Sequence, residues 1–340
     1  MLAFVLFGLT QCIFASRLQS FDLETVNYAK RFDFESTVHG IENLTTNPKV
    51  IFLGTSLLRY PFYDLNEKLQ QSRTKVSSGI SPIEDAHRCL AAPGSLSDNY
   101  SFAIAGILVS DFNLIFRKFI SRDITDDTVY VECSPRAFYD SNLQPSATPA
   151  FKYFCDLQEV LSPSKSFSDR FDRLQWLTNI LLPTYRFRHD IQENVAHLLA
   201  VRLSGQSDVQ SVEHVPFRHA TAAEALARSI AEYQGRYAGI SIKACKPQLS
   251  QLQDLIGHVQ AKKAKPVLLV MPLTQVNIEL LPGGFYDDWK NSIKQIAARH
   301  HCKILDLSEY QFENSDFRDS VHLSSGGAAK FLNVIESHRH

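Results

Sequence analysis

Short runs of apolar residues recur along the chain, and four of them are rich in residues that favour strands. They are KVIFLG (49–54), TVYVEC (128–133), PVLLVMP (266–272) and KILDL (303–307), and NYSFAIAG (99–106) is a weaker fifth. A continuous apolar run of this length is typical of a strand that is buried on both faces, as in a parallel sheet. The pattern therefore predicts about five parallel strands.

Stretches with helical periodicity separate several of these runs. One of them, residues 285–301, leads directly into the run at 303–307. Strands that alternate with helices predict a doubly wound α/β domain. We expect a three-layer, flavodoxin-like fold over residues 45–335, with the sheet between two layers of helices.

The interval between the third and fourth predicted strands breaks this alternation. Residues 137–262 contain helical patterns at 171–182 and 221–239, but no convincing strand. We interpret the interval as a helical insertion that packs over the carboxyl edge of the sheet, as a lid or as a surface for a protein partner. Residues 204–214 have the composition of a flexible loop.

The first fifteen residues carry no charged side chain. A membrane span needs about 20 apolar residues, so this stretch fits better the apolar core of a secretory signal, with Ala15 and Ser16 near the cleavage point. The basic start of a signal is missing, which leaves a trimmed longer anchor, a short membrane tether or a buried first helix as alternatives. We expect residues 1–18 to be a signal peptide or membrane anchor, and the chain to be exported or membrane-anchored outside the cytoplasm.

Composition and charge narrow the classes of partner. The formal net charge is -1 and no basic run stands out, whereas nucleic-acid-binding proteins usually have a basic patch. Six cysteines without a C-x-x-C pair, and 12 histidines without a ligand pattern, predict neither a metal nor a cofactor. In an exported chain some of Cys89, Cys155 and Cys245 could form disulfides, whereas Cys133 and Cys302 are expected to be core thiols.

A polar turn after the first predicted strand is the most specific local feature. Gly54-Thr55-Ser56 places a hydroxyl at the carboxyl end of that strand, which is the edge where open α/β sheets bind their ligands. If a helix begins just after Ser56, its free N–H groups can stabilise negative charge at the same point. The serine could then attack a carbonyl while its own N–H binds the oxyanion. The alternative is that Ser56 is a structural N-cap.

A second feature, Asp319-Ser-Val-His322, lies near the other end of the chain. A carboxylate three residues before a histidine can fold back and accept the Nδ1–H, which leaves Nε2 free to take a proton from a serine. Asp316 lies in the same segment and is an alternative partner for the histidine. A serine after the first strand and Asp-x-x-His after the last would meet at one edge of the predicted sheet.

Together the two features resemble the SGNH (GDSL-like) superfamily of hydrolases and acyltransferases. The turn at Ser56 is similar to the first sequence block of that superfamily, and the segment from Asp319 to His322 is similar to its last. The resemblance covers residues 45–140 and 265–335, and it is greatest to bacterial exported or membrane-tethered members, several of which act on cell-surface polymers. It implies that Ser56 is the nucleophile, His322 the general base and then acid, and Asp319 the carboxylate that orients the histidine.

The resemblance also implies an oxyanion hole. Its donors would be the backbone N–H groups of Ser56 and of Gly106, which resembles the glycine of the second block, although a tight turn would also explain a glycine there. The family usually places an asparagine after the third strand, but residues 132–136 read Glu-Cys-Ser-Pro-Arg. Ser134 or Arg136 would have to supply that donor. Loss of one donor costs on the order of 100- to 1000-fold in rate, so without a replacement donor we expect an esterase rate below that of a complete oxyanion hole.

These features predict a serine-dependent acyl-ester hydrolase or O-acyltransferase that works through an acyl-Ser56 intermediate. The expected substrate is an acyl ester, such as an acylated glycan or lipid of the cell envelope, and the sequence leaves open whether water or another hydroxyl accepts the acyl group. The missing asparagine motivates an alternative, a catalytically weak or inactive SGNH-fold protein that binds or assembles envelope components. A nucleotide- or flavin-binding domain is disfavoured, because the turn after the first strand has one glycine instead of a glycine-rich cradle.

Overall fold

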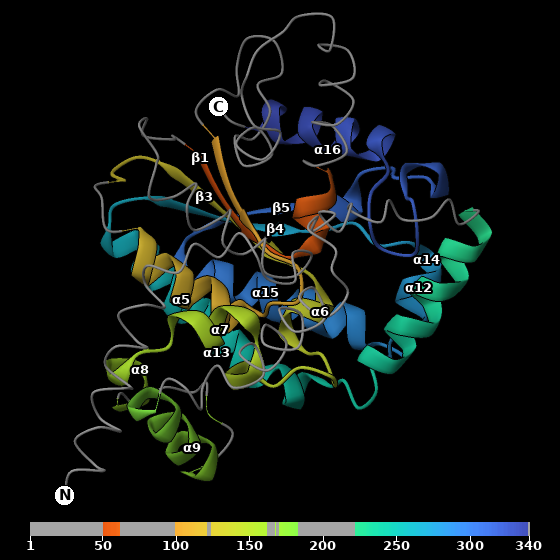
Figure 1. Ribbon diagram of the computed structural model, residues 1–340. Helices are drawn as coiled ribbons and strands as arrows, with labels where there is room; N and C mark the ends of the chain where they lie inside the picture. The colour runs from red at the N-terminus through yellow and green to blue at the C-terminus, as the bar shows by residue number, and fades with distance from the viewer. Residues whose placement is uncertain are drawn as a thin grey trace, which may run out of the picture.

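The computed structural model contains a wholly parallel sheet of five strands (Figure 1). The structure describes residues 50–61, 99–120, 124–161, 167, 170–182 and 222–338. The strands are β1 (Val50–Gly54), β2 (Asn99–Ala103), β3 (Thr128–Cys133), β4 (Lys265–Val270) and β5 (Lys303–Asp306). Their order, β2-β1-β3-β4-β5, is that of the flavodoxin-like doubly wound fold, so the predicted fold class is confirmed.

Helices cover both faces of this sheet. On one face lie α5 (Val109–Phe119), α13 (Ile242–Ala261) and α15 (Phe285–His300), with α13 in contact with the other two. On the other face lie α16 (Ser325–Ser337) and the helical residues 56–61, drawn in orange in Figure 1. A strand between two helical layers must present apolar side chains on both sides, which explains the unbroken apolar runs of the sequence.

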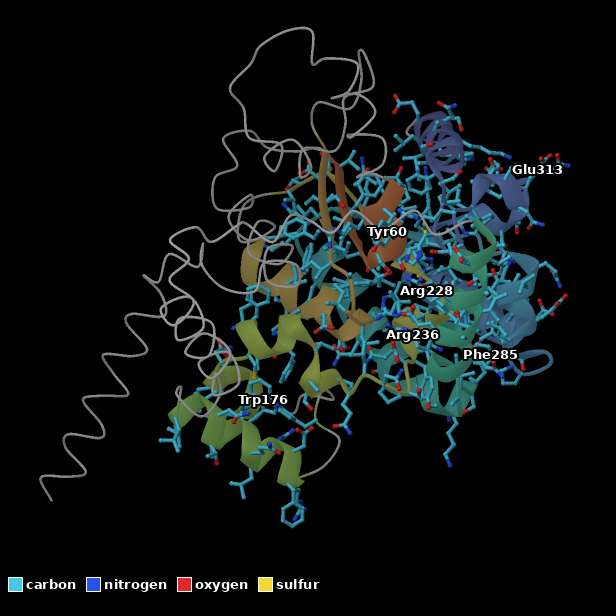
Figure 2. The ribbon with its side chains drawn as sticks, turned by 45° about the vertical axis from the view of Figure 1, so that its right-hand side comes forward. Tyr60, Trp176, Arg228, Arg236, Phe285 and Glu313 are labelled. Carbon is cyan, nitrogen blue, oxygen red and sulfur yellow. The ribbon has the colours of Figure 1, made fainter. Side chains whose placement is uncertain are left out.

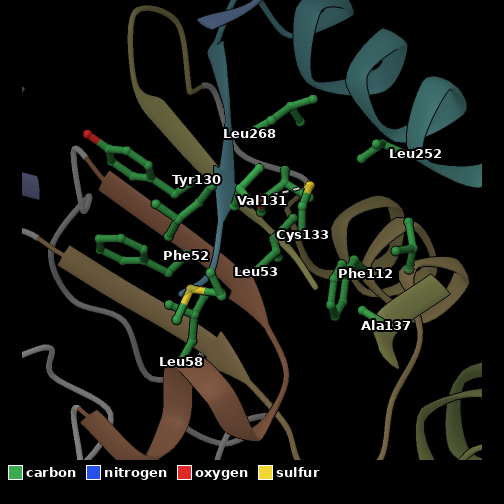
Figure 3. Packing of buried hydrophobic residues seen from close by; sticks show 14 of the residues in the cluster. Phe52, Leu53, Leu58, Phe112, Tyr130, Val131, Cys133, Ala137, Leu252 and Leu268 are labelled. Atoms are coloured by element: carbon green, nitrogen blue, oxygen red, sulfur yellow. Dashed lines mark hydrogen bonds between the residues drawn. The ribbon is translucent and has the colours of Figure 1, made fainter. Parts of the chain in front are cut away.

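Neighbouring strands show how the two faces are filled. Phe52 of β1 is paired with Tyr130 of β3, and their rings stack at 4.9 Å between centroids. The next residues along, Leu53 and Val131, point to the opposite face, toward the layer that holds Phe112 of α5 (Figure 3). This alternation within an apolar run places the main core on both sides of the sheet.

The described part of the interval between β3 and β4 is helical and contains no strand. Its helices are α6 (Pro135–Phe138), α7 (Pro149–Phe154), α8 (Leu157–Leu161), α9 (Arg170–Leu181) and α12 (Ala222–Arg236), followed by α13, and a 3-10 turn covers Pro145–Ala147. Helices α7 to α9 pack beside α5 around a small separate core (Leu114, Phe151, Cys155, Val160 and Trp176). The remaining short elements are α14 (Gln275–Glu279) and the 3-10 turns Leu307–Glu309 and Asn314–Asp316.

We predicted that residues 137–262 form one helical insertion, and for the last part of this range the prediction is wrong. Helix α13 is not part of a lid, because it packs against β4 and between α5 and α15 as a regular layer of the fold. Its apolar positions, among them Leu252, Leu255 and Val259, recur at helical spacing and are fully buried. A periodic pattern shows that a helix has a buried face but does not say which surface covers that face.

The cysteine predictions have a mixed outcome. Cys133 and Cys302 are free thiols in or beside the main core, as expected. Cys245 is a free thiol as well, and Cys155 and Cys245 form no disulfide with each other, so a bridge between these two residues is wrong. Cys155 belongs to the small core beside α5 and Cys245 to the main core, which keeps the two thiols in different clusters. Cys89 lies outside the described residues.

The predictions for residues 1–18 and 204–214 also lie outside the described residues. Among the helices of the described ranges, none has the length and apolar character needed to cross a lipid bilayer.

Candidate active site

The turn that carries Ser56 joins β1 to the helical residues 56–61. Thr55 caps that helix: its carbonyl oxygen accepts from Leu58 N at 3.2 Å and from Arg59 N at 3.1 Å, and its hydroxyl accepts from Leu57 N at 3.3 Å. Ser56 is therefore the first helical residue instead of the cap. Its hydroxyl is not used for capping, and its N–H is one of the first-turn donors for which the helix itself provides no acceptor.

Ser56, His322 and Asp319 meet at the carboxyl edge of the sheet. Ser56 Oγ lies 3.1 Å from His322 Nε2, and His322 Nδ1 lies 2.7 Å from Asp319 Oδ2. The side chains of His322 and Asp319 are 15% and 16% exposed, and Ser56 is 9% exposed. The structure thus brings together three residues that the sequence analysis named, with the imidazole between the hydroxyl and the carboxylate.

Asp319 is held by the turn that it begins. Its Oδ1 accepts from Val321 N at 2.9 Å and from His322 N at 2.8 Å, while Oδ2 faces the imidazole. Burial acts to raise the pKa of Asp319, but hydrogen bonds from the His322 ring and from the two backbone N–H groups outweigh it and hold the pKa below its ordinary value. The carboxylate is therefore ionised over the neutral pH range and fixes Nδ1 of the histidine as the donor.

Asp316, the alternative partner, has its carboxylate engaged by other groups. Its carboxylate accepts from Lys330 Nζ at 3.0 Å and from Glu313 N at 2.9 Å. It closes the short helical turn before the site and leaves Asp319 as the carboxylate that contacts His322.

An aromatic ring packs against the imidazole, and a guanidinium group packs in turn against that ring. The ring of Tyr60 packs edge-on against His322 at 4.6 Å between centroids, and the Arg318 guanidinium lies 5.0 Å from the centre of the Tyr60 ring. Tyr60 comes one helical turn after Ser56, so one short helix presents both the hydroxyl and the ring. In Figure 2, Tyr60 lies on the part of the molecule where α12 carries Arg228 and Arg236, well away from Trp176.

A buried carboxyl group that the sequence analysis did not single out lies beneath the serine turn. Glu132, at the end of β3, accepts from Thr55 N at 2.5 Å, from Thr55 Oγ1 and from Ser134 Oγ at 2.8 Å. Burial raises the pKa of Glu132 above its ordinary value, against these hydrogen bonds and the charge of Arg136, which act to lower it. The signal in the sequence was a charged residue inside the otherwise apolar run TVYVEC.

The three residues predicted to supply further oxyanion donors, Gly106, Ser134 and Arg136, differ in whether a donor is left for a substrate. Gly106 follows β2 in a left-handed turn with φ of 79°, and β2 is the neighbour of β1 in the sheet. Ser134 donates its one hydroxyl proton to Glu132. Arg136 is 3% exposed, with Nε 3.3 Å from Asp140 Oδ2 and with no partner for Nη1 among the described residues.

Helix α12 is tied to the loop that carries Asp319 and His322. Ser229 of α12 bonds to the hydroxyl of Ser320, which is fully buried, and accepts from Ser320 N at 3.3 Å. Thr274 Oγ1 donates to the Ser320 carbonyl oxygen at 2.7 Å. Ser320, the residue directly after the aspartate, is therefore fixed from two sides.

Within the described part of the chain, no group of three or more His, Cys, Asp or Glu side chains is placed to hold a metal ion. The arrangement at the sheet edge has the parts of a serine nucleophile instead: a hydroxyl, a base within hydrogen-bond reach and a carboxylate that orients the base.

The known proteins that this chain resembles are distant from it. No protein-family model and no curated protein sequence matches the chain. A solved structure from Streptococcus pneumonia, provisionally described as a platelet activating factor, is similar with a TM-score of 0.44 and 10% identity over 97% of this chain and 99% of that one. An alpha/beta hydrolase enzyme from the metagenome of Lake Arreo, Spain, gives a TM-score of 0.36 and 10% identity over 85% and 93%. At these values activity has to be argued from the site itself.

Proposed function

We propose that this protein is a serine-dependent acyl-ester hydrolase or O-acyltransferase of the SGNH type that works through an acyl-Ser56 intermediate. The observation that carries the proposal is the line of three groups from Ser56 Oγ to His322 Nε2 at 3.1 Å and from His322 Nδ1 to Asp319 Oδ2 at 2.7 Å. Each residue has the partner that its role requires.

In the first half of the reaction, Ser56 Oγ attacks the ester carbonyl carbon while its proton passes to His322 Nε2. Asp319 stabilises the imidazolium that forms, because its pKa is held below the ordinary value and it stays ionised. The tetrahedral intermediate then collapses, the bond to the leaving alcohol breaks, and Nε2 returns the proton to the alcohol oxygen. The acyl group remains on Ser56.

In the second half, an acceptor hydroxyl attacks the acyl-serine with His322 again as base. Water as the acceptor releases a carboxylic acid, whereas a sugar or alcohol hydroxyl yields a new ester. In both cases His322 returns the proton to Ser56 Oγ. The two activities need the same residues and differ only in which hydroxyl reaches the acyl group.

Two backbone groups are suited to stabilise the oxyanion. The N–H of Ser56 lies in the first turn of its helix, where the helix dipole also favours negative charge. The N–H of Gly106 follows the end of β2, the strand next to β1. We assign these two groups as the donors, with Arg136 as a third if a substrate oxygen reaches its buried Nη1, which lacks a partner among the described residues.

The proposed substrate is an acylated glycan or lipid of the cell envelope. Two sequence features support it: the uncharged, apolar first fifteen residues, and the resemblance to exported or membrane-tethered SGNH proteins. On this proposal the chain acts outside the cytoplasm, attached or close to a membrane, and the helices between β3 and β4 offer a surface for a protein partner.

A Ser56→Ala variant of the full chain tests the proposal with p-nitrophenyl acetate as the substrate. We expect turnover to fall at least 1000-fold, to the level left by binding and oxyanion stabilisation, with an unchanged circular dichroism spectrum. Wild-type turnover by this variant would exclude Ser56 as the nucleophile.

The second candidate function is a binding or assembly protein of the envelope that has lost catalysis. The engaged proton of Ser134 favours it, because this hydroxyl cannot replace the asparagine that the resemblance calls for. A fluorophosphonate probe separates the two candidates: covalent labelling of Ser56 under native conditions supports the enzyme, and the absence of labelling supports the binding protein.

A further inference from the structure

Glu132 brings a carboxylate from β3 underneath the turn that carries Ser56. It is fully buried, and β3 is the neighbour of β1 in the sheet. Oε2 accepts from Thr55 N at 2.5 Å, and Thr55 Oγ1 donates at 2.8 Å to Oε1 and at 3.0 Å to Oε2. Both protons that Thr55 can donate therefore end on this one side chain.

The carboxylate approaches so closely that the preceding residue has to be small. A Cβ atom added to Gly54 would lie 2.7 Å from Glu132 Oε2 and 2.4 Å from Leu58 Cδ1. Both distances are far below normal van der Waals contact. The glycine of Gly54-Thr55-Ser56 thus makes room for the support beneath the serine turn.

Thr55 connects Glu132 to Ser56, because Thr55 also caps the helix that begins at Ser56. It is 0% exposed, and its carbonyl oxygen and hydroxyl also hold the start of the helix whose first residue is Ser56. A shift of Thr55 would move Ser56 Oγ away from His322 Nε2. A misplacement of about 1 Å in a catalytic group can cost about 100-fold in rate.

We propose that Glu132 is a positioning residue: its carboxyl group accepts from both the N–H and the hydroxyl of Thr55, and through Thr55 it holds Ser56 Oγ in place opposite His322 Nε2. This inference rests on the proposed role of Ser56 as the nucleophile. Glu132 is not a catalytic residue in this scheme, since it lies beneath the turn and reaches the reacting atoms only through Thr55.

Three variants test the role of the carboxyl group. In Glu132→Ala the buried N–H of Thr55 loses its acceptor, and we expect kcat on p-nitrophenyl acetate to fall about 100-fold with little change in KM. In Glu132→Gln the amide oxygen can accept from Thr55 N and Oγ1 while the amide nitrogen donates to Ser134 Oγ, so we expect kcat within about threefold of wild type. Thr55→Val removes only the hydroxyl contacts and should lower kcat about tenfold.

A fluorophosphonate probe distinguishes a mispositioned serine from a smaller folded fraction. The probe forms a bond from Ser56 Oγ to phosphorus with loss of fluoride. In Glu132→Ala the labelling rate should fall in parallel with kcat, while the final extent of labelling stays at one probe per chain. A reduced extent with an unchanged rate would mean partial misfolding and would overturn the positioning role.

Glu159→Ala serves as the matched control for loss of a buried carboxylate. Glu159 is 4% exposed and pairs with Arg117 in the part of the fold that contains α8, away from the serine turn. We expect a lower unfolding midpoint and an unchanged kcat. If Glu132→Ala cannot be obtained folded, Glu132→Gln and Thr55→Val decide: the positioning role is excluded if the first is inactive or the second is fully active.

The outcome for Ser56→Ala keeps this inference separate from the proposed function. If Ser56→Ala is inactive and Glu132→Ala is as active as wild type, the positioning role is wrong and the nucleophile stands. If Ser56→Ala remains active, or wild type is neither labelled nor active, the proposed function fails and this inference fails with it.

Discussion

At the scale of residues, the site depends on hydrogen bonds that fix the position of its exchangeable protons. Asp319 accepts two backbone N–H groups with one oxygen and the imidazole with the other, so the tautomer of His322 is determined before a substrate binds. Thr55 takes over the capping of the helix, so the hydroxyl of Ser56 is left to His322. Preorganisation of this kind lowers the barrier because no group has to reorient during the reaction.

Asp319→Asn should separate geometry from electrostatics. The amide oxygen can still accept from Val321 N and His322 N, but the amide nitrogen would face Nδ1 and force the imidazole to accept there. The proton would then sit on Nε2, where Ser56 needs a base, and kcat should fall about 10³- to 10⁴-fold at neutral pH. Steady-state kinetics on the purified variant measure this.

Asp316→Asn is the control for that variant, since Asp316 binds Lys330 and not the histidine. We expect its kcat to stay within about threefold of wild type, because the amide oxygen of the asparagine can still accept from Glu313 N and only the charge of the pair with Lys330 is lost. Equal losses in the two variants would contradict the assignment of Asp319 as the orienting carboxylate.

The sequence was informative for residues whose role follows from local spacing and topology. Ser56, Asp319 and His322 could be named because the ends of parallel strands share one edge and because Asp-x-x-His closes within a turn. The support by Glu132 and the edge contact of Tyr60 could not be predicted. Both depend on tertiary contacts, one of them with a residue 77 positions away.

At the scale of elements, α12 is coupled to the loop between Asp319 and His322. Ser229→Ala removes one of two partners of the Ser320 hydroxyl, which keeps Asn277 Nδ2 at 3.3 Å, and it removes the acceptor of the buried Ser320 N. An unpaired buried N–H costs about 1–3 kcal/mol, and the loop should become less well fixed. We expect kcat to fall about tenfold, in line with a shift of well under 1 Å in the imidazole, with little change in KM.

Ser141→Ala provides the comparison at the carboxyl end of the same helix. Ser141 Oγ donates to the carbonyl oxygen of Gly235 at 2.7 Å on the exposed side of α12. Its loss should leave kcat unchanged. If Ser229→Ala behaves in the same way, then α12 does not position the histidine loop.

The start of α5 makes stability depend on pH. Asp111 is fully buried, accepts from Leu108 N at 2.7 Å and from Thr148 Oγ1 at 2.6 Å, and burial raises its pKa from 3.8 to about 7 against these bonds and the charge of Arg136. A raised pKa means that the folded state binds the proton more tightly than the unfolded chain. Stability from this group is therefore complete below pH 3.8 and is lost as pH rises through about 7.

Asp111→Asn should remove that dependence. The amide can accept from Leu108 N and donate to Thr148 Oγ1, which can turn its own proton to the carbonyl oxygen of Pro145. Between pH 5 and pH 8, wild type should lose about 3 kcal/mol more stability than the variant, since each pH unit of the shift is worth about 1.4 kcal/mol. Urea unfolding at the two pH values measures it; parallel losses in the two proteins would contradict a raised pKa.

The apolar pattern predicted the strands of the fold correctly, but it did not predict where each helix packs. The five strands lie within a few residues of their predicted positions, because burial on both faces demands unbroken apolar runs. Helix α13 was assigned to the insertion, although it covers β4. Amphipathic spacing identifies a buried face, but the choice between a lid and a sheet layer is made by distant residues.

At the scale of the whole molecule, the described residues form two hydrophobic cores of unequal size. The main core surrounds the sheet and reaches from β1 to α16, whereas the small one joins α7, α8 and α9 to Leu114 of α5. The sheet edge that carries Ser56 and His322 is built on the main core alone. The α7–α9 part should therefore be able to open without loss of the site, as weakly packed segments often do.

The two tryptophans report on these two cores separately. Trp289 is fully buried in the main core, and Trp176 lies in the small one with its ring 4.9 Å from that of Phe151. In a Trp176→Phe variant the fluorescence comes from Trp289, and in Trp289→Phe it comes from Trp176. We expect the Trp176 signal to change at a urea concentration at least 1 M lower than esterase activity is lost, because a segment with few buried apolar contacts unfolds at a lower free energy than the sheet.

Each of the two variants also needs its own reference, since the Trp289→Phe change weakens the main core and lowers the urea midpoint at which activity is lost. The comparison is therefore made within one protein, between fluorescence and activity measured in the same urea series. In Trp176→Phe the Trp289 signal and the activity should be lost together, because both depend on the core that carries the sheet. If fluorescence and activity coincide in Trp289→Phe as well, the two cores unfold as one unit, and the helices between β3 and β4 are then as much a part of the catalytic scaffold as the sheet.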